Sequence, residues 1–309
     1  MKRILITGAT GFIGSHVARA YVREDCVVYA LVRKTSDLWR LCDAQGQVHI
    51  VECDLLSAEE VDDCLDQIRP NLCVHMAWYT EPGKYLTSYE NPRMLNASLQ
   101  LASSLAKVGC ERLVATGTCA EYATSLDKLS EVSLTKPQSL YAASKLALFL
   151  VLEQIGCLSN MQVAWVRLFY QFGPFEDERR LVPFVIRALL AGETAKVTAG
   201  DQIRDFLHVE DVAAAVVAVA KSRLTGVVNV GSGNPTKVKE VVSNIAAILN
   251  KPDLIAFGAR LPEASDPIFV CADNRKLTEG TGWIPKYDLQ KGLQETIEWW
   301  RKRLEQANP

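Results

Sequence analysis

The feature that most constrains the fold is the regular alternation of short apolar runs and longer helical segments over the first 170 residues. β-branched runs predict strands at residues 3–7, 27–32, 49–53, 72–75, 112–116 and 163–168. Between them, segments of helical periodicity begin near Phe12, Ala58, Asn91 and Ser139, and the last is expected to end near Gly156. Such alternation is typical of a parallel sheet covered by helices. The sequence therefore predicts an α/β fold with a Rossmann-type, doubly wound parallel sheet.

The second part of the chain has a looser pattern. Beyond residue 170, turns rich in Gly and Pro separate segments in which helices dominate. We expect residues 1–168 to form the sheet domain, with residues 204–232 returning to it. Residues 169–309 are expected to form a smaller, mostly helical C-terminal lobe.

Composition excludes several classes of function. The 309 residues are 49% hydrophobic and 23% charged, which is ordinary for a soluble chain with a full-sized core. A net charge of −2 without a dense Lys/Arg block argues against a nucleic-acid partner. The longest apolar run, residues 212–220, is too short to span a bilayer, and the N-terminus lacks a signal-peptide pattern, so no membrane association is expected. Nine cysteines without a Cys-x-x-Cys pair, and only four histidines, predict no metal site and a reducing, cytoplasmic location.

A glycine-rich loop follows the first predicted strand and opens the first predicted helix. It runs Gly8-Ala9-Thr10-Gly11-Phe12-Ile13-Gly14. In this position backbone amides and the helix N-terminus can face a pyrophosphate, and glycines permit the tight turn and close approach. We expect Gly8, Thr10, Gly11, Phe12, Ile13 and Gly14 to bind a dinucleotide, although the spacing differs from the usual fingerprint and a purely structural turn is the alternative.

The end of the second predicted strand indicates which dinucleotide is bound. A carboxylate there would bind the adenosine ribose of NAD, whereas this chain offers Arg33, whose guanidinium suits the extra phosphate of NADP. NADP(H) is therefore the preferred cofactor and NAD(H) a possible one, with a solvated surface pair as the alternative role of Arg33 and Lys34. After the third strand, Asp54 with Leu55 is expected to meet the adenine, or else Asp54 simply begins a turn.

A second group of residues has the side chains needed for proton transfer. Tyr141 and Lys145 lie one helical turn apart, so the ammonium can stabilise a phenolate and lower the tyrosine pKa. The strand before them ends in Thr116 and Thr118, whose hydroxyls can face the same cleft at the carboxyl edge of the sheet. These residues predict proton transfer next to the cofactor.

Taken together, these motifs resemble those of the extended short-chain dehydrogenase/reductase family. The shared features are the Gly-x-x-Gly-x-x-Gly loop, the Thr-bearing strand end, Tyr-x-x-x-Lys, and the runs at residues 204–211 and 229–233. The likeness covers nearly the whole chain. Members of this family are NAD(P)-dependent epimerases, 4,6-dehydratases and ketoreductases of nucleoside-diphosphate sugars, so the resemblance implies such a sugar as substrate.

The resemblance also assigns roles around the cofactor. It makes Tyr141 the general acid/base, Lys145 the residue that holds the nicotinamide ribose and depresses the tyrosine pKa, and Thr118 the donor to the reacting oxygen. Thr116, His75 and Ala77 would flank the cofactor. For His75, a buried ring satisfied by backbone is the favoured alternative.

Substrate contacts are expected mainly from the second lobe. The resemblance places Arg204 and Arg260 at the sugar diphosphate, with Arg180 approaching the same site, and a guanidinium suits that chemistry. Tyr170 stands where epimerases usually carry Asn, which suggests a changed sugar pocket.

The residues after Thr118 restrict the reaction. Dehydratases of the family carry Asp-Glu there, whereas this chain has Cys119 and Ala120, and Glu121 is out of register. A 4,6-dehydratase and a 3,5-epimerase are thus disfavoured. An NADPH-dependent 4-ketoreductase of a 4-keto-6-deoxyhexose is the first prediction, an NAD-dependent 4-epimerase the alternative, and a non-catalytic dinucleotide sensor the remote one. The resemblance further predicts a homodimer, paired through the helix of Tyr141 and the helix near residues 96–107.

Overall fold

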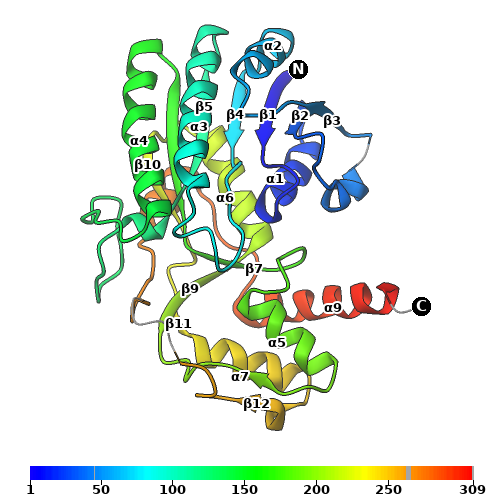
Figure 1. The fold of residues 1–309 in the computed structure, drawn as a ribbon. Helices are drawn as coiled ribbons and strands as arrows, with labels where there is room; N and C mark the ends of the chain where they lie inside the picture. The colour runs from blue at the N-terminus through cyan, green and yellow to red at the C-terminus, as the bar shows by residue number, and fades with distance from the viewer. Residues whose placement is uncertain (45, 262–265, 308–309) are drawn as a thin grey trace.

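The computed structural model describes residues 1–44, 46–261 and 266–307, and its centre is a seven-stranded parallel sheet. The order across this sheet is β10-β6-β5-β4-β1-β2-β3, the arrangement of a doubly wound fold (Figure 1). The strands are β1 Lys2–Thr7, β2 Cys26–Val32, β3 Val48–Glu52, β4 Leu72–His75, β5 Arg112–Thr118, β6 Gln162–Leu168 and β10 Gly226–Val230. The predicted α/β Rossmann-type fold is confirmed.

Helices cover both faces of this sheet because its strands are apolar on both sides. Side chains of α1 (Phe12–Val22) and α6 (Val209–Lys221) form one core with the sheet. Side chains of α2 (Ala58–Ile68), α3 (Glu90–Lys107) and α4 (Leu140–Ser159) form the core on the other face. The apolar run at residues 212–220 is thus a buried helix, as expected.

Two boundaries differ from the expectation. β5 continues to Thr118, which keeps both Thr116 and Thr118 on the sheet edge. Helix α4 does not end near Gly156, because Asn160 adopts the left-handed conformation and closes the helix there. Gly156 is instead needed for packing, since a Cβ at this position would lie 2.8 Å from the carbonyl oxygen of Met161.

The second lobe combines helices with small sheets. Its core unites α5 (Leu181–Leu190), α7 (Val238–Ile248) and α9 (Leu289–Ala307). Helices dominate, as expected, but the lobe also contains short strands. One sheet has the order β11-β9-β7 (Pro235–Lys237, Ile203–His208, Tyr170–Phe172), and a two-stranded one pairs β12 (Ile255–Ala256) with β8 (Ala195–Lys196).

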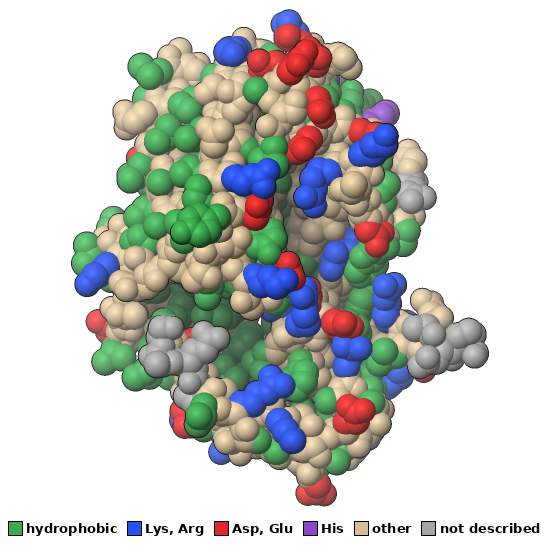
Figure 2. All heavy atoms as spheres, in the orientation of Figure 1, with side chains coloured by type: hydrophobic (Ala, Val, Ile, Leu, Met, Phe, Trp, Pro, Cys, Tyr) green, Lys and Arg blue, Asp and Glu red, His purple; other side chains and the backbone are tan. Residues whose placement is uncertain are grey.

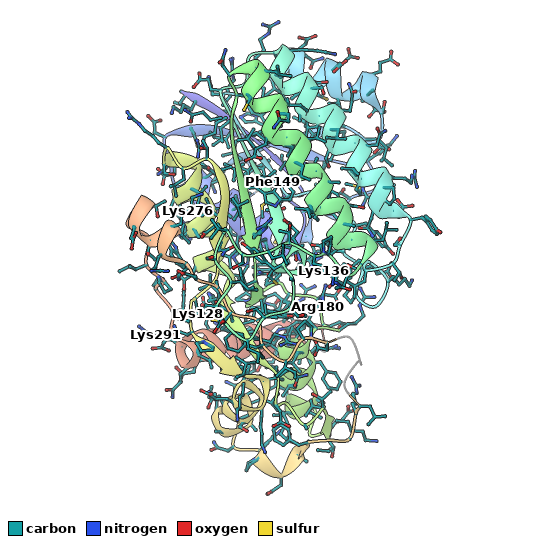
Figure 3. The ribbon with its side chains drawn as sticks, turned by 90° about the vertical axis from the view of Figure 1, so that its left-hand side faces the viewer. Lys128, Lys136, Phe149, Arg180, Lys276 and Lys291 are labelled. Carbon is teal, nitrogen blue, oxygen red and sulfur yellow. The ribbon has the colours of Figure 1, made fainter. Side chains whose placement is uncertain are left out.

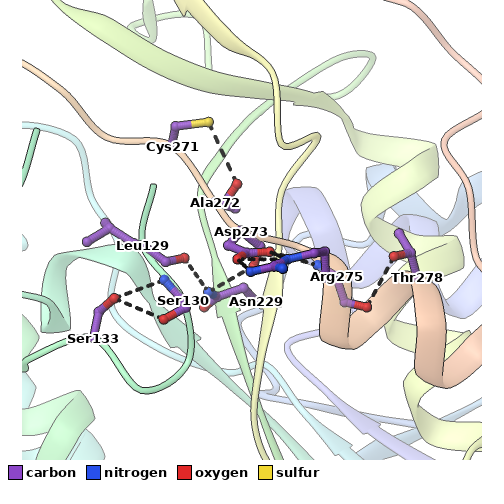
Figure 4. Close-up of polar contacts among 9 residues, drawn as sticks. All are labelled: Leu129, Ser130, Ser133, Asn229, Cys271, Ala272, Asp273, Arg275 and Thr278. Carbon is purple, nitrogen blue, oxygen red and sulfur yellow. Dashed lines mark hydrogen bonds and ion pairs between the residues drawn. The ribbon is translucent and has the colours of Figure 1, made fainter. Parts of the chain in front are cut away.

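A polar seam ties the edge strand β10 to the neighbouring loops (Figure 4). The Asn229 amide donates to the carbonyl oxygens of Leu129 and Asp273 at 2.8 and 3.3 Å. Its oxygen accepts a hydrogen bond from the Tyr122 hydroxyl at 2.7 Å. Nearby, the buried Asp205 carboxylate accepts hydrogen bonds from the backbone of the 231–233 turn and of Ala272. These bonds give Asp205 and Asn229, one from each of the 204–211 and 229–233 runs, a structural role.

One helix of the described residues, α4, is long and apolar enough to cross a membrane by length and composition alone. It packs against α3 and against the sheet, and it carries the buried Lys145. Its outer face remains apolar, with Leu150, Val151 and Leu158 exposed. The hydropathy of α4 therefore reflects a core face together with an unusually apolar surface stripe.

Candidate functional site

The glycine loop has no room for side chains. Gly8 has φ +72°, and a Cβ there would lie 2.7 Å from the backbone nitrogen of Ala77 on the adjoining strand end. A Cβ on Gly14 would overlap the carbonyl oxygen of Gly8, and one on Gly11 would lie 3.1 Å from it. Gly11 also precedes α1 without any side-chain cap on the first amides. The loop therefore offers bare backbone amides at a helix N-terminus, which fits a pyrophosphate.

Two arginines follow strand β2. Arg33 follows β2, exposed, in a tight turn closed by Ser36. Arg40, in the 3₁₀ helix Trp39–Ala44, was not predicted from the sequence because no motif marks it. Its Nη1 lies 3.5 Å from the carbonyl oxygen of Thr10 in the glycine loop, and its Nε donates to the carbonyl of Phe175 at 3.0 Å.

The expected adenine contacts have structural roles in this conformation. The Asp54 carboxylate accepts a hydrogen bond from the Leu56 backbone at 3.0 Å, as a turn-forming aspartate does. Leu55 packs, half-buried, against the core formed with α2. Of the two roles expected for Asp54, an adenine contact or the start of a turn, this hydrogen bond supports the turn.

His75 lies in the core rather than in the cleft. Its Nδ1 is 2.7 Å from the Thr7 hydroxyl and its Nε2 is 2.8 Å from the Ser98 hydroxyl. Burial lowers the pKa of His75 to about 3. The ring nitrogens are hydrogen-bonded to side-chain hydroxyls, not to backbone as expected. The backbone carbonyl of His75 accepts a hydrogen bond from the Thr116 hydroxyl at 3.4 Å.

Thr118, Tyr141 and Lys145 meet at the carboxyl edge of the sheet, as the strand and helix order requires. The Lys145 ammonium donates to the carbonyl oxygen of Thr116 at 2.8 Å, and it lies 3.9 Å from the centre of the Trp78 ring. Tyr141 is half-buried one turn earlier on α4. The segment before α4 is fixed by Ser139, whose hydroxyl caps the helix.

Burial dominates the titration of this pair. It lowers the pKa of Lys145 to about 7. It raises the pKa of Tyr141, which the adjacent Tyr85 raises further and the Thr118 hydroxyl lowers. This differs from the expected depressed tyrosine pKa, because desolvation disfavours the phenolate more than the neighbouring groups stabilise it.

Aromatic side chains that the sequence analysis missed surround Tyr141. The Tyr85 ring meets the Tyr141 ring edge-on at 4.9 Å between centroids, and Trp78 does so at 6.5 Å. Both come from the segment after β4, which carries no periodic signal. Arg180 stacks over Tyr85 at 5.3 Å, and it lies where the two parts of the molecule meet (Figure 3). In the space-filling view a recess lined by hydrophobic side chains opens between these parts (Figure 2).

The other two arginines that were expected to bind the substrate, Arg204 and Arg260, make contacts within the protein. Arg204 is buried, pairs with Asp266 at 2.5 Å and stacks over the Tyr170 ring at 5.2 Å. Its guanidinium is therefore engaged within the protein in this conformation. Arg260 is exposed and stacks over Phe184 of α5 at 4.8 Å. Arg180, by contrast, contacts Tyr85, whose ring in turn contacts Tyr141.

Glu121 points away from the cleft. Its carboxylate is fully buried and pairs with Arg167 at 2.7 Å. Burial raises the pKa of Glu121, and the guanidinium opposes that shift. The expectation that this acid does not stand in for a dehydratase acid agrees with this geometry.

Fold and site define a dinucleotide-binding enzyme of the oxidoreductase type. A model of the NAD dependent epimerase/dehydratase family matches residues 4–231, and the chain belongs to this family. The resemblance to extended short-chain dehydrogenases/reductases is thereby confirmed.

Relatives align over nearly the whole chain. UDP-glucose 4-epimerase of Azospirillum brasilense is 28% identical, covering 99% of this chain and 93% of that protein. dTDP-glucose 4,6-dehydratase of Neisseria meningitidis serogroup B is 26% identical, covering 97% and 93%. The solved structure of MoeE5 in complex with UDP-glucose and NAD is 30% identical, covers 98% of this chain and 99% of that one, and superposes with a TM-score of 0.82. These proteins are epimerases, dehydratases and NAD binders, which favours the alternative 4-epimerase over the first prediction.

Proposed function

We propose that this protein is a nucleoside-diphosphate-hexose 4-epimerase, which oxidises the C4 hydroxyl and reduces the resulting ketone from the other face. The observation that carries the proposal is that Tyr141 neighbours the Thr118 hydroxyl while Lys145 binds the Thr116 carbonyl on the same strand, in a chain whose glycine loop fits a dinucleotide. The absence of an Asp-Glu pair after Thr118 supports epimerisation over dehydration. The names of the aligned relatives support the nucleotide-sugar substrate.

In the proposed reaction, Tyr141 transfers the hydroxyl proton, while Lys145 and Thr118 assist it. A dinucleotide held by the glycine loop would supply the hydride chemistry at C4. Tyr141 takes the hydroxyl proton as the carbonyl forms and gives it back as the alcohol is restored. Because burial raises the pKa of Tyr141, its phenol holds its proton in the free chain. Lys145, one helical turn away, would favour the phenolate whenever its own amine is protonated. Thr118 donates a hydrogen bond to the same oxygen, where negative charge develops in the transition state.

A 4-ketoreductase using NADPH is the second candidate, and the two arginines favour it. Arg33 follows β2 where an NAD enzyme would carry an acid, and Arg40 reaches the glycine loop from the adjoining 3₁₀ helix. Two guanidiniums at this end of the site would suit the extra phosphate of NADP. Tyr170, where epimerases usually carry Asn, is consistent with a changed sugar pocket.

The cofactor that accompanies the purified protein separates the two candidates. An epimerase regenerates its cofactor in each turnover, so we expect NAD to co-purify and UDP-glucose to equilibrate with UDP-galactose without added dinucleotide. A protein without bound NAD that consumes NADPH stoichiometrically with a 4-keto-6-deoxy sugar would instead establish the reductase.

We also propose that the protein forms a homodimer through α3 and α4. We further propose that it works in a reducing compartment such as the cytoplasm. Leu150 and Leu158 on α4 are 55% and 88% exposed, and a second copy would bury them. All nine cysteines are free thiols, which suits a reducing compartment. Leu150→Glu places a charge on this apolar face, so light scattering should give a dimeric mass for the wild type and a monomeric one for the variant. A monomeric wild type would contradict the dimer.

A further inference from the structure

The buried carboxylate of Glu121 lies directly behind Thr118. It accepts hydrogen bonds from the Thr118 backbone N–H at 2.9 Å and from the Arg167 Nε–H at 2.7 Å. The Trp165 indole N–H lies 3.1 Å from both oxygens. The carboxylate thus links the last residue of β5 to the middle of the neighbouring strand β6.

The hydroxyl of Thr118 is fixed by the same turn. Its Oγ1 accepts a hydrogen bond from the Ala120 backbone N–H at 3.2 Å, while Glu121 holds the Thr118 N–H, so the two residues form a reciprocal capping box. One acceptor position of the hydroxyl is therefore occupied from the protein side. The hydroxyl proton is left to be donated outward, and the β-branched side chain has few other rotamers.

Stability alone does not account for a charged pair at this place. Buried ion pairs usually contribute little compared with apolar residues of similar volume. The pair also restricts its neighbour, because a Cβ at Gly117 would lie 2.6 Å from a Glu121 oxygen and would overlap the Trp165 indole nitrogen. The strand thus has glycine next to Thr118, where both the Trp165 indole and the Glu121 carboxylate need the space.

We propose that Glu121 is a positioning residue, which holds the backbone and rotamer of Thr118 so that the hydroxyl donates to the reacting oxygen of the substrate. This inference rests on the proposed C4 oxidation, since it assigns Thr118 to that oxygen. Glu121 touches neither substrate nor cofactor and acts only through Thr118. Misplacing a catalytic group by about 1 Å can reduce a rate about 100-fold.

The test removes the whole ion pair with the double substitution Glu121→Leu/Arg167→Met, which avoids leaving one charge buried alone. We expect kcat to fall about 10- to 100-fold with the KM for the dinucleotide unchanged. In a Thr118→Ala background the same double substitution should cause no further loss, because no hydroxyl remains to be positioned. Asp211→Asn is the control, since Asp211 also binds backbone amides from a buried position, at 2.8 and 3.0 Å, but at the start of α6.

A second measurement is independent of turnover. In protein labelled at threonine methyl groups, the ¹³C order parameter of the Thr118 methyl should be high in the wild type and lower in the double variant. An unchanged order parameter, or an equal fractional loss of kcat with and without the Thr118 hydroxyl, would overturn the positioning role. If the double variant does not fold, Glu121→Gln takes its place, because Thr118 and Arg167 donate to different oxygens of Glu121 and the amide replaces one of these acceptors by an NH2 donor. A wild type without turnover would contradict the proposed function, whereas the methyl measurement still decides the role of Glu121.

Discussion

The candidate site lies between two walls, the carboxyl edge of the seven-stranded sheet and the facing side of the second lobe. The side chains of the two walls are fixed by different kinds of contact. On the sheet wall, Thr118 and Lys145 are fixed by directional hydrogen bonds of 2.8 to 3.2 Å. On the second-lobe wall, Arg180 contacts the ring face of Tyr85 at 5.3 Å, whereas Arg204 is held by Asp266 as well as by the Tyr170 ring. Hydrogen bonds fix position and angle, whereas a guanidinium can slide over a ring. Under the proposed function, we therefore expect the sheet wall to set the reaction and the second lobe to contribute to the choice of sugar.

The largest expected effect comes from removing the proton carrier of the sheet wall. Tyr141→Phe keeps the ring and its contact with Tyr85 but has no hydroxyl, so kcat should fall by about 10² to 10⁴, as is typical for lost acid/base catalysis. Dinucleotide binding, measured by fluorescence titration, should remain. The matched control is Tyr85→Phe, which should retain far more activity. Comparable losses in both variants would show that the wrong phenol has been assigned.

Next in size is the glycine loop on the same wall. Gly14→Ala introduces a Cβ that overlaps the Gly8 carbonyl, and overpacking of this kind costs about 1–3 kcal/mol. The loop must shift, so dinucleotide affinity measured by calorimetry should fall about 10- to 100-fold. Gly11→Ala, whose Cβ would meet the same oxygen at 3.1 Å, should have the smaller effect. The reverse order would contradict this account of the loop.

The adenosine end offers a smaller and more selective test. If Arg33 binds the NADP phosphate, Arg33→Ala should weaken NADPH binding about tenfold, the scale of one hydrogen bond to a charged group. NADH should be nearly unaffected, and the exposed Arg93→Ala on α3 is the control. Equal losses for the two dinucleotides would remove the argument for NADP and with it the support for the reductase.

A separate effect, on stability rather than on activity or affinity, comes from Lys145. Its pKa of about 7 in the folded chain lies below the ordinary lysine value of 10.5, so the unfolded chain binds more protons between these pH values. This residue should therefore make the protein more stable as pH rises from about 7. In urea unfolding between pH 6.5 and 9, the wild type should gain stability relative to Lys145→Met. A parallel pH dependence would show that Lys145 is not desolvated.

How far the sequence predicts the site follows from the same comparison. The sheet order brings strand ends together, so Thr118, Tyr141 and the glycine loop could be located from motif and alternation alone. Arg40 and Tyr85 could not, because they reach the site from irregular segments without periodicity. Arg204 was expected to be open to a ligand, and only the tertiary structure reveals its pairing with Asp266. Helix α4 ends at Asn160 rather than Gly156 for a similar reason, since packing against β6 decides where glycine is needed.

The most direct test of the central claim follows the hydrogen at C4 of the sugar. Purified protein is incubated with UDP-glucose deuterated at C4, without added dinucleotide, and the products are analysed by NMR and mass spectrometry. An epimerase of the proposed kind yields UDP-galactose with the deuterium still at C4, because the hydride returns to the carbon it left. Loss of the label to solvent, or a 4-hydroxy sugar formed only when NADPH is supplied together with a keto sugar, would contradict the 4-epimerase assignment.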